Sequence, residues 1–155
     1  MPKVKTHDTI NTAVLVGVLS GLYYLMWKEI GFVSIYLNTY TLLVFSLAYL
    51  FATFYLSPDL DTNSKPYKRW GMLRILWWPY KVIFKHRGFS HNPILGPLSI
   101  ILNLGLIIAA LLLLGGVDLQ IIPTNFIIPA MAGMVLSMEV HIISDSFVSK
   151  LKSIF

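Results

Sequence analysis

The sequence predicts an all-α fold: a four-helix transmembrane bundle with an interfacial loop at the cytoplasmic face between spans two and three. Hydrophobic residues make up 56% of the chain and charged residues 12%, whereas soluble domains average about 45–50% and about 25%. The mean hydropathy is +0.71. Apolar residues gather in four runs close to the roughly 20 residues that a helix needs to cross a bilayer. We therefore expect a single membrane domain. Because the chain has no cysteine, disulfides, thiolate zinc sites and cysteine nucleophiles are excluded.

The four predicted spans cover approximately residues 10–27, 39–56, 94–117 and 124–143. The first follows Lys3 and Lys5, as the apolar part of a secretory signal would. It is too long for that role, however, and its last residues offer no small-residue cleavage site, so we interpret it as a retained span. The fourth span is interrupted by polar residues and by Pro129, which should kink the helix.

The lysines and arginines indicate the orientation. If both termini lie on one side of the membrane, that side carries eleven basic residues and the opposite side carries only Lys28. Loops rich in lysine and arginine stay in the cytoplasm. We therefore expect a multi-pass protein of the cytoplasmic (inner) membrane, with both termini and the loop between spans two and three in the cytoplasm.

That loop, over residues 62–93, combines cations with aromatic side chains. From Lys65 to Gly88 it has seven basic residues and no acidic one, interleaved with tyrosines and tryptophans. This composition is typical of the headgroup region, so one interpretation is an anchor that contacts anionic membrane lipid. The other is a clamp for a substrate phosphate. The candidate substrate-binding residues are Arg69, Arg74, Lys85 and Arg87. Nucleic-acid binding is less favoured, because the aromatic residues fit lipid headgroups equally well.

Histidines and carboxylates occur at those ends of the four spans that the predicted threading brings to one membrane face. They are His7 and Asp8 before the first span, Asp59 and Asp61 after the second, His86 and His91 before the third, and His141 and Asp145 at the end of the fourth. Imidazole and carboxylate together are the ligands of divalent metals such as zinc and manganese. The convergence therefore predicts a metal centre that holds more than one ion.

Each fragment also has an alternative interpretation. Asp8 at a helix start is typical of a cap, and carboxylates in a loop such as Asp59 and Asp61 are usually solvated. His141 and Asp145, four residues apart, share one helix face. They are either two ligands or a ligand with the carboxylate that orients it.

Several motifs resemble those of a known family. Ser57-Pro58-Asp59-Leu60-Asp61, Arg69-Trp70-Gly71, Trp78-Pro79-Tyr80 and the segment from His86 to His91 resemble the DUF2227 family of metal-binding membrane proteins. More distantly they resemble the YdjM-type membrane-bound metal-dependent hydrolases. The resemblance implies a metal site at His7, Asp59, Asp61, His86, His91, His141 and Asp145. The broader relatives are grouped with zinc-dependent phospholipase C, which implies phosphoester hydrolysis by analogy.

The function predicted from these features is a membrane-embedded, metal-dependent hydrolase that cleaves a phosphoester or pyrophosphate of an amphiphilic substrate. Asp8 or Asp145 would act as general base if it is not a ligand. The alternative is a non-catalytic protein that binds or transports a divalent metal. Against transport, the spans offer few polar groups at membrane depth. Among them, Glu139 lies about 160° around its helix from His141. It would face a neighbouring span or another subunit, which leaves a homo-oligomer open.

Overall fold

The computed structural model describes residues 4–29, 36–84, 92–121 and 123–154, and within these ranges it contains helices and no strands. The long helices of this part of the chain are α1 (Val4–Trp27), α3 (Thr39–Tyr55), α7 (Leu95–Leu114) and α8 (Thr124–Ile154). All four are long and apolar enough to cross a membrane. The predicted all-α class with four membrane-length helices is confirmed.

Several helix ends differ from the predicted spans, at the start of α1 and the end of α8 because polar residues continue the helix beyond its apolar run. α1 begins at Val4 rather than near residue 10, and α8 continues to Ile154 rather than ending near residue 143. α7 ends at Leu114, short of residue 117, and is followed by Gly116 with a φ of 67°. A glycine in this left-handed conformation is a common helix terminator. Hydropathy indicates where the chain leaves an apolar environment, whereas backbone hydrogen bonds determine where a helix ends.

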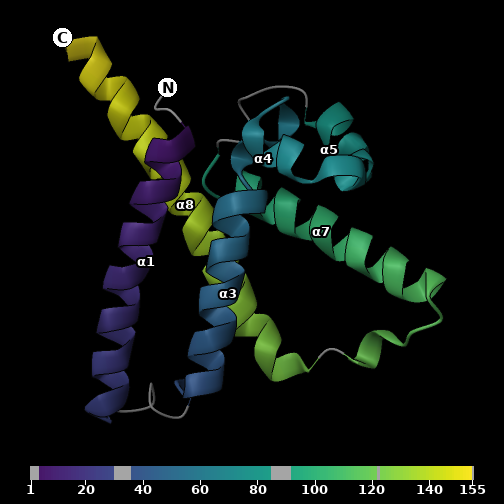
Figure 1. Ribbon diagram of the computed structural model, residues 1–155, viewed down its shortest axis with the longest axis horizontal. Helices are drawn as coiled ribbons and strands as arrows, with labels where there is room; N and C mark the ends of the chain where they lie inside the picture. Colours follow the sequence, from purple (N-terminus) through teal and green to yellow (C-terminus); the bar gives the residue numbers. More distant parts are fainter. Residues whose placement is uncertain (1–3, 30–35, 85–91, 122, 155) are drawn as a thin grey trace.

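Three of the long helices lie together, and the fourth diverges from them (Figure 1). α3 packs closely along α8, and α1 lies beside both. α7 buries only residues of its first half, namely Gly96, Pro97, Ile100 and Leu104, and then runs outward at an angle. The bundle is therefore compact around α1, α3 and α8 and open on the side of α7.

The close approach of α3 and α8 depends on Gly133. A Cβ added there would lie 2.4 Å from the backbone oxygen of Phe45 and 3.1 Å from the backbone nitrogen of Tyr49. Small residues at helix contacts in membranes allow this backbone-to-backbone packing. One turn further along, Ser137 lies 2.8 Å from the Thr53 hydroxyl, an interhelical hydrogen bond between two buried side chains.

The segment between α3 and α7 is not a simple loop. It folds into η1 (Pro58–Asp61), α4 (Lys65–Arg69), η2 (Gly71–Trp77) and α5 (Trp78–Ile83), and η3 (Leu119–Ile121) follows α7 later in the chain. Each of η1 and α4 begins after a serine whose side chain caps it and has proline in its first turn, which is a typical helix start.

This folded segment is attached to the end of α3. The Arg69 guanidinium donates to the backbone oxygen of Phe54 at 3.0 Å, and the Trp70 indole donates to that of Tyr55 at 2.9 Å. The last carbonyls of a helix have no partner within it, so these bonds satisfy them. Trp77 and Tyr80 are fully buried in a core that includes Leu56. The segment therefore covers one end of the helices.

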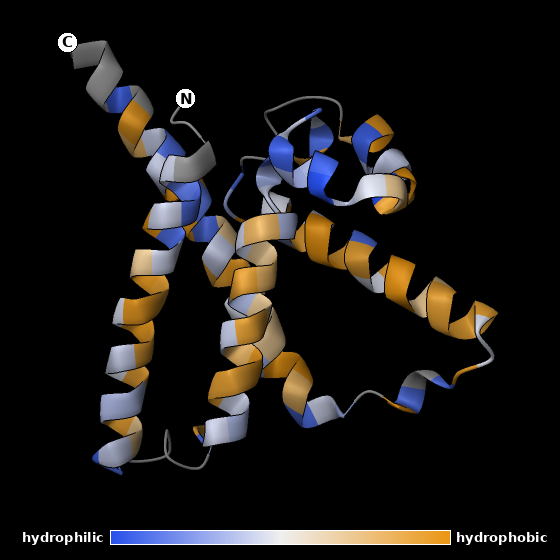
Figure 2. Cartoon of the chain, viewed as in Figure 1, coloured by the Kyte–Doolittle hydropathy of each residue, from blue (hydrophilic) through white to orange (hydrophobic). Residues whose placement is uncertain are grey.

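Polar residues gather at the same end. The N-terminal end of α1, the C-terminal end of α8 and the segment with α4 and α5 lie at one end of the molecule, whereas α1 ends and α3 begins at the other (Figure 1). Figure 2 shows hydrophilic residues concentrated at the first end and hydrophobic residues along the four long helices. The histidines and aspartates of α1, of α8 and of η1, which follows α3, thus come to the same end of the molecule.

Candidate metal centre

The centre of the site is a contact between the start of α1 and the second half of α8. His7 lies on the second turn of α1 with 6% of its surface exposed, and His141 on α8 has 8% exposed. Their rings stack with centroids 4.3 Å apart and an angle of 27° between planes. Two buried imidazoles from opposite ends of the sequence are thereby placed face to face.

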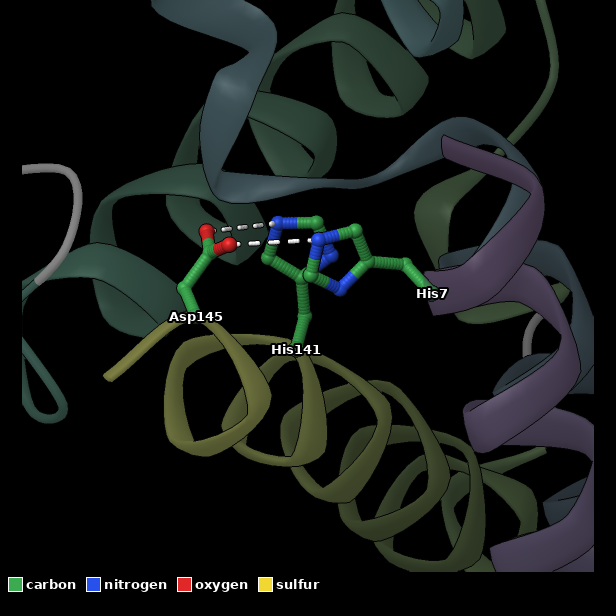
Figure 3. Close-up of side chains that lie close together, drawn as sticks. All are labelled: His7, His141 and Asp145. Atoms are coloured by element: carbon green, nitrogen blue, oxygen red, sulfur yellow. Dashed lines mark ion pairs between the residues drawn. The ribbon is translucent and has the colours of Figure 1, made fainter. Parts of the chain in front are cut away.

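Asp145 contacts both rings (Figure 3). Its Oδ1 lies 3.1 Å from His7 Nε2, and its Oδ2 lies 3.5 Å from His141 Nε2. One ligand atom from each of the three residues lies within 4.8 Å of those of the other two. His141 and Asp145 share a helix face at the i, i+4 spacing, as the sequence predicted, and His7 comes from the facing helix.

Asp59 approaches the same group from η1. Its Oδ2 lies 3.6 Å from His141 Nε2, and the Ser57 hydroxyl lies 3.5 Å from the same nitrogen. The Ser57 side chain also accepts the backbone N–H of Asp59, which fixes the short helix beside His141. Three segments thus contribute two imidazoles and two carboxylates.

The spacing of these donors suits a cation. Ligand atoms at about 2.0–2.1 Å from a tetrahedral zinc ion lie about 3.3 Å from one another. The contacts of 3.1, 3.5 and 3.6 Å between imidazole nitrogens and carboxylate oxygens bracket that value. Asp59 and Asp145 are partly buried beside the same imidazole, and burying carboxylates is costly unless a cation or hydrogen-bond donors compensate them. The donor set and its spacing therefore fit a divalent metal.

Asp61, the second carboxylate of the Asp-x-Asp motif, lies elsewhere. It has 7% of its surface exposed and is not part of the group formed by His7, His141 and Asp145. Burial raises the pKa of Tyr80, a hydrogen bond with Ser99 opposes the shift, and the nearby Asp61 carboxylate adds to it. The two carboxylates of the motif therefore lie in different surroundings: Asp59 is beside His141, and Asp61 is near Tyr80.

Asp8 and Arg69 pair with each other. The Arg69 guanidinium donates to Asp8 Oδ2 at 2.9 Å while it also holds the end of α3. This ion pair joins α1 to α4 next to the buried histidines. Arg74 is exposed on η2, and four further predicted residues, Lys85, His86, Arg87 and His91, lie outside the described residues.

Sequence reasoning gave no role to several buried polar residues around the site. The Tyr49 hydroxyl donates to the backbone oxygen of Asn11 at 3.1 Å, and Ser144 contacts both His7 and His141. Asn11 and Ser137 could have been found by spacing, since each lies four residues from a histidine on the same helix face. Ser144 lies three residues after His141, which is also a spacing of helix neighbours, whereas Thr53 gave no such signal.

The polar cluster ends within the membrane-length part of the helices. Leu15, Phe45 and Tyr49 form a second buried core, packed against Leu19, Leu22 and other apolar side chains. The buried polar residues around the histidines thus border a cluster of apolar side chains between the helices.

Comparison with known proteins agrees with the donor set. The family DUF2227, described as an uncharacterized metal-binding protein family, matches residues 2–155. An uncharacterized protein of Aquifex aeolicus (strain VF5) is 53% identical over 55 residues, which are 35% of this chain and 39% of that protein. The match thus spans less than half the length of that relative. No solved structure matches the chain. Because the family match covers almost the entire sequence and the structure joins histidine and aspartate ligands from three segments, the chain belongs to the DUF2227 family of metal-binding proteins.

Proposed function

We propose that this protein is a membrane-embedded, metal-dependent hydrolase that cleaves a phosphoester or pyrophosphate of an amphiphilic substrate at the cytoplasmic face. The observation that carries the proposal is the convergence of His7, His141, Asp145 and Asp59 at one end of four membrane-length helices. These residues would hold a divalent cation, zinc or manganese by ligand type.

Such a cation would supply Lewis acidity, which activates water and stabilises charge on phosphoryl oxygens. Side chains of the protein would bind the cation and accept the proton of the attacking water. Asp145 contacts both imidazoles through separate oxygens, so we assign it to holding the cation. Asp8 is then the candidate general base, and its ion pair with Arg69 would keep the carboxylate in place.

The surroundings support an anionic, amphiphilic substrate. Residues 65–83 carry Lys65, Lys68, Arg69, Arg74 and Lys81 and no acidic residue. A hollow of about 610 Å³ on this segment combines Arg74 with aromatic and apolar walls, which are Tyr67, Gly71, Met72, Ile75 and Trp78. A cation beside apolar walls is suited to a phosphate group attached to a hydrocarbon chain.

The test uses purified protein in detergent, loaded with zinc or manganese and offered phospholipids, prenyl phosphates and prenyl pyrophosphates. We expect phosphate release that disappears after chelation and returns when metal is added. Nucleotides serve as soluble controls without an acyl chain. If the metal-loaded protein releases phosphate from none of these compounds, the hydrolase proposal fails.

A second function, metal binding without catalysis, is favoured by the number of donors. Two imidazoles and two carboxylates would fill a tetrahedral zinc site, and a catalytic zinc keeps one position for water or substrate. X-ray absorption of the zinc-loaded protein would separate the two. Three protein ligands with one water support the hydrolase, and four protein ligands support metal holding. Transport is less favoured, because the buried side chains next to the polar cluster, such as Leu15 and Phe45, are apolar and conduction needs polar groups at membrane depth.

A further inference from the structure

Ser144 makes two hydrogen bonds, and together they determine which partner receives the hydroxyl proton. Its hydroxyl donates to the backbone oxygen of His141 at 2.8 Å, since a carbonyl can only accept. Its oxygen also lies 2.8 Å from His7 Nδ1. A serine hydroxyl has a single proton. Both bonds can therefore be made at once only if His7 Nδ1 carries a hydrogen and donates it to Ser144.

A neutral His7 ring with its hydrogen on Nδ1 has the lone pair on Nε2. That nitrogen faces Asp145 Oδ1 at 3.1 Å, and the ring is buried at 6% exposure. A lone pair and a carboxylate oxygen directed at each other at this distance repel unless a proton or a metal cation lies between them. The hydrogen bond on one side of the ring thus prepares the other side for a cation.

We infer that Ser144 is a positioning residue of the metal site, whose hydroxyl holds His7 in the Nδ1–H tautomer so that Nε2 presents its lone pair to the cation. This inference rests on the metal site of the proposed function. Histidine ligands usually donate their second ring N–H to such a partner, and loss of that partner typically weakens metal binding by about 10–100-fold. Ser144 also links His7 of α1 to the backbone of His141 on α8. One hydroxyl thus orients the His7 ring relative to α8, the helix that supplies His141 and Asp145.

The experiment measures Zn²⁺ affinity by competition with a chelator for the full-length protein in detergent. We expect Ser144→Ala to weaken binding by about 10–100-fold. Ser144→Thr should restore most of it, because the hydroxyl is retained. Ser46→Ala is the matched control, since Ser46 on α3 is a partly buried serine that donates to a carbonyl of its own helix, that of Leu42. It should bind Zn²⁺ as wild type does.

A spectroscopic measurement separates orientation of His7 from general stability. Nitrogen NMR of ¹⁵N-histidine protein, with His7 assigned by comparison with His7→Gln, should show a protonated Nδ1 and a Zn²⁺-bound Nε2 in wild type. Ser144→Ala should lose this preference and Ser46→Ala should keep it. Zinc bound through Nδ1 of His7 in wild type, or equal affinity of wild type and Ser144→Ala, overturns the inference.

The two proposals can fail separately. If wild type binds no metal, the metal site of the proposed function fails, while the tautomer of His7 in metal-free wild type and in Ser144→Ala still decides whether Ser144 fixes it. If Ser144→Ala does not fold, the wild-type spectrum alone decides, because an Nδ1 without a hydrogen contradicts the inference.

Discussion

At the residue scale, Asp145 holds the central position. It contacts Nε2 of both histidines, at 3.1 and 3.5 Å, whereas Asp59 lies 3.6 Å from Nε2 of His141. The side chain of Asp145 is 14% exposed and that of Asp59 is 23% exposed. A ligand that is closer and less solvated should contribute more to metal affinity, so the two carboxylates are not equivalent.

We therefore predict that Asp145→Asn reduces Zn²⁺ affinity more than Asp59→Asn does. The amide keeps the shape of the side chain but removes its charge. Isothermal titration of both variants with Zn²⁺ would measure the difference. Asp118→Asn, far along the chain after α7, is the control and should bind as wild type does. An equal or larger loss for Asp59→Asn would contradict the central position of Asp145.

Asp8 provides the test of the catalytic assignment. If it is the general base, Asp8→Asn should leave zinc content unchanged and slow phosphate release by about 10²–10⁴-fold. Asp145→Asn should lose zinc and turnover together. Unchanged turnover in a folded, zinc-loaded Asp8→Asn protein would reduce Asp8 to a structural partner of Arg69.

At the element scale, the contact between α3 and α8 positions the ligands. Gly133 brings the helix backbones together, Ser137 bonds to Thr53 one turn later, and His141 follows after another turn beside Ser57. Residues four apart lie on one face of a helix. The same stripe of α8 therefore packs against α3 and carries a candidate ligand, so a change in helix packing should alter the candidate metal site.

We predict that Gly133→Ala destabilises the fold by about 1–3 kcal/mol, because overpacking forces the backbones apart. Gly105→Ala on α7 is the control. A Cβ there meets nothing within 4 Å, and alanine should be tolerated or slightly stabilising in a helix. Unfolding in detergent, followed by circular dichroism, would compare the two. Similar stability of both variants would show that α3 and α8 adjust without cost.

At the scale of the whole molecule, the arrangement places the candidate ligands of α1, η1 and α8 at one end. The ends of α1 and α8 and the α4–α5 segment share that end (Figure 1), and hydrophilic residues concentrate there (Figure 2). The strong bias of basic residues toward this end leads us to propose that it faces the cytoplasm.

The absence of native cysteine makes this orientation directly testable. Single cysteines introduced at Ser64 and at Gly116 should react with a membrane-impermeant maleimide from opposite sides. In cells whose cytoplasmic membrane is intact and whose outer envelope admits the reagent, we expect labelling at Gly116. Ser64 should be labelled only after the cytoplasmic membrane is broken. Labelling of both positions from one side would contradict the four-span arrangement.

The sequence by itself determined the class of the protein. Four apolar runs, few charges and the order of its histidine and aspartate motifs predicted four membrane-length helices and a metal-binding family, and the structure and the family match confirm both. These features are local, because hydropathy and motif spacing are read from neighbouring residues. Only the tertiary structure decided that His7 stacks on His141, that Asp59 lies beside His141 while Asp61 lies near Tyr80, that Arg69 pairs with Asp8, and that Ser144 contacts the His7 ring. Each of these contacts depends on how the helices rotate and pack against one another, and close packing of residues distant in sequence, such as Gly133 against Phe45, fixes that rotation.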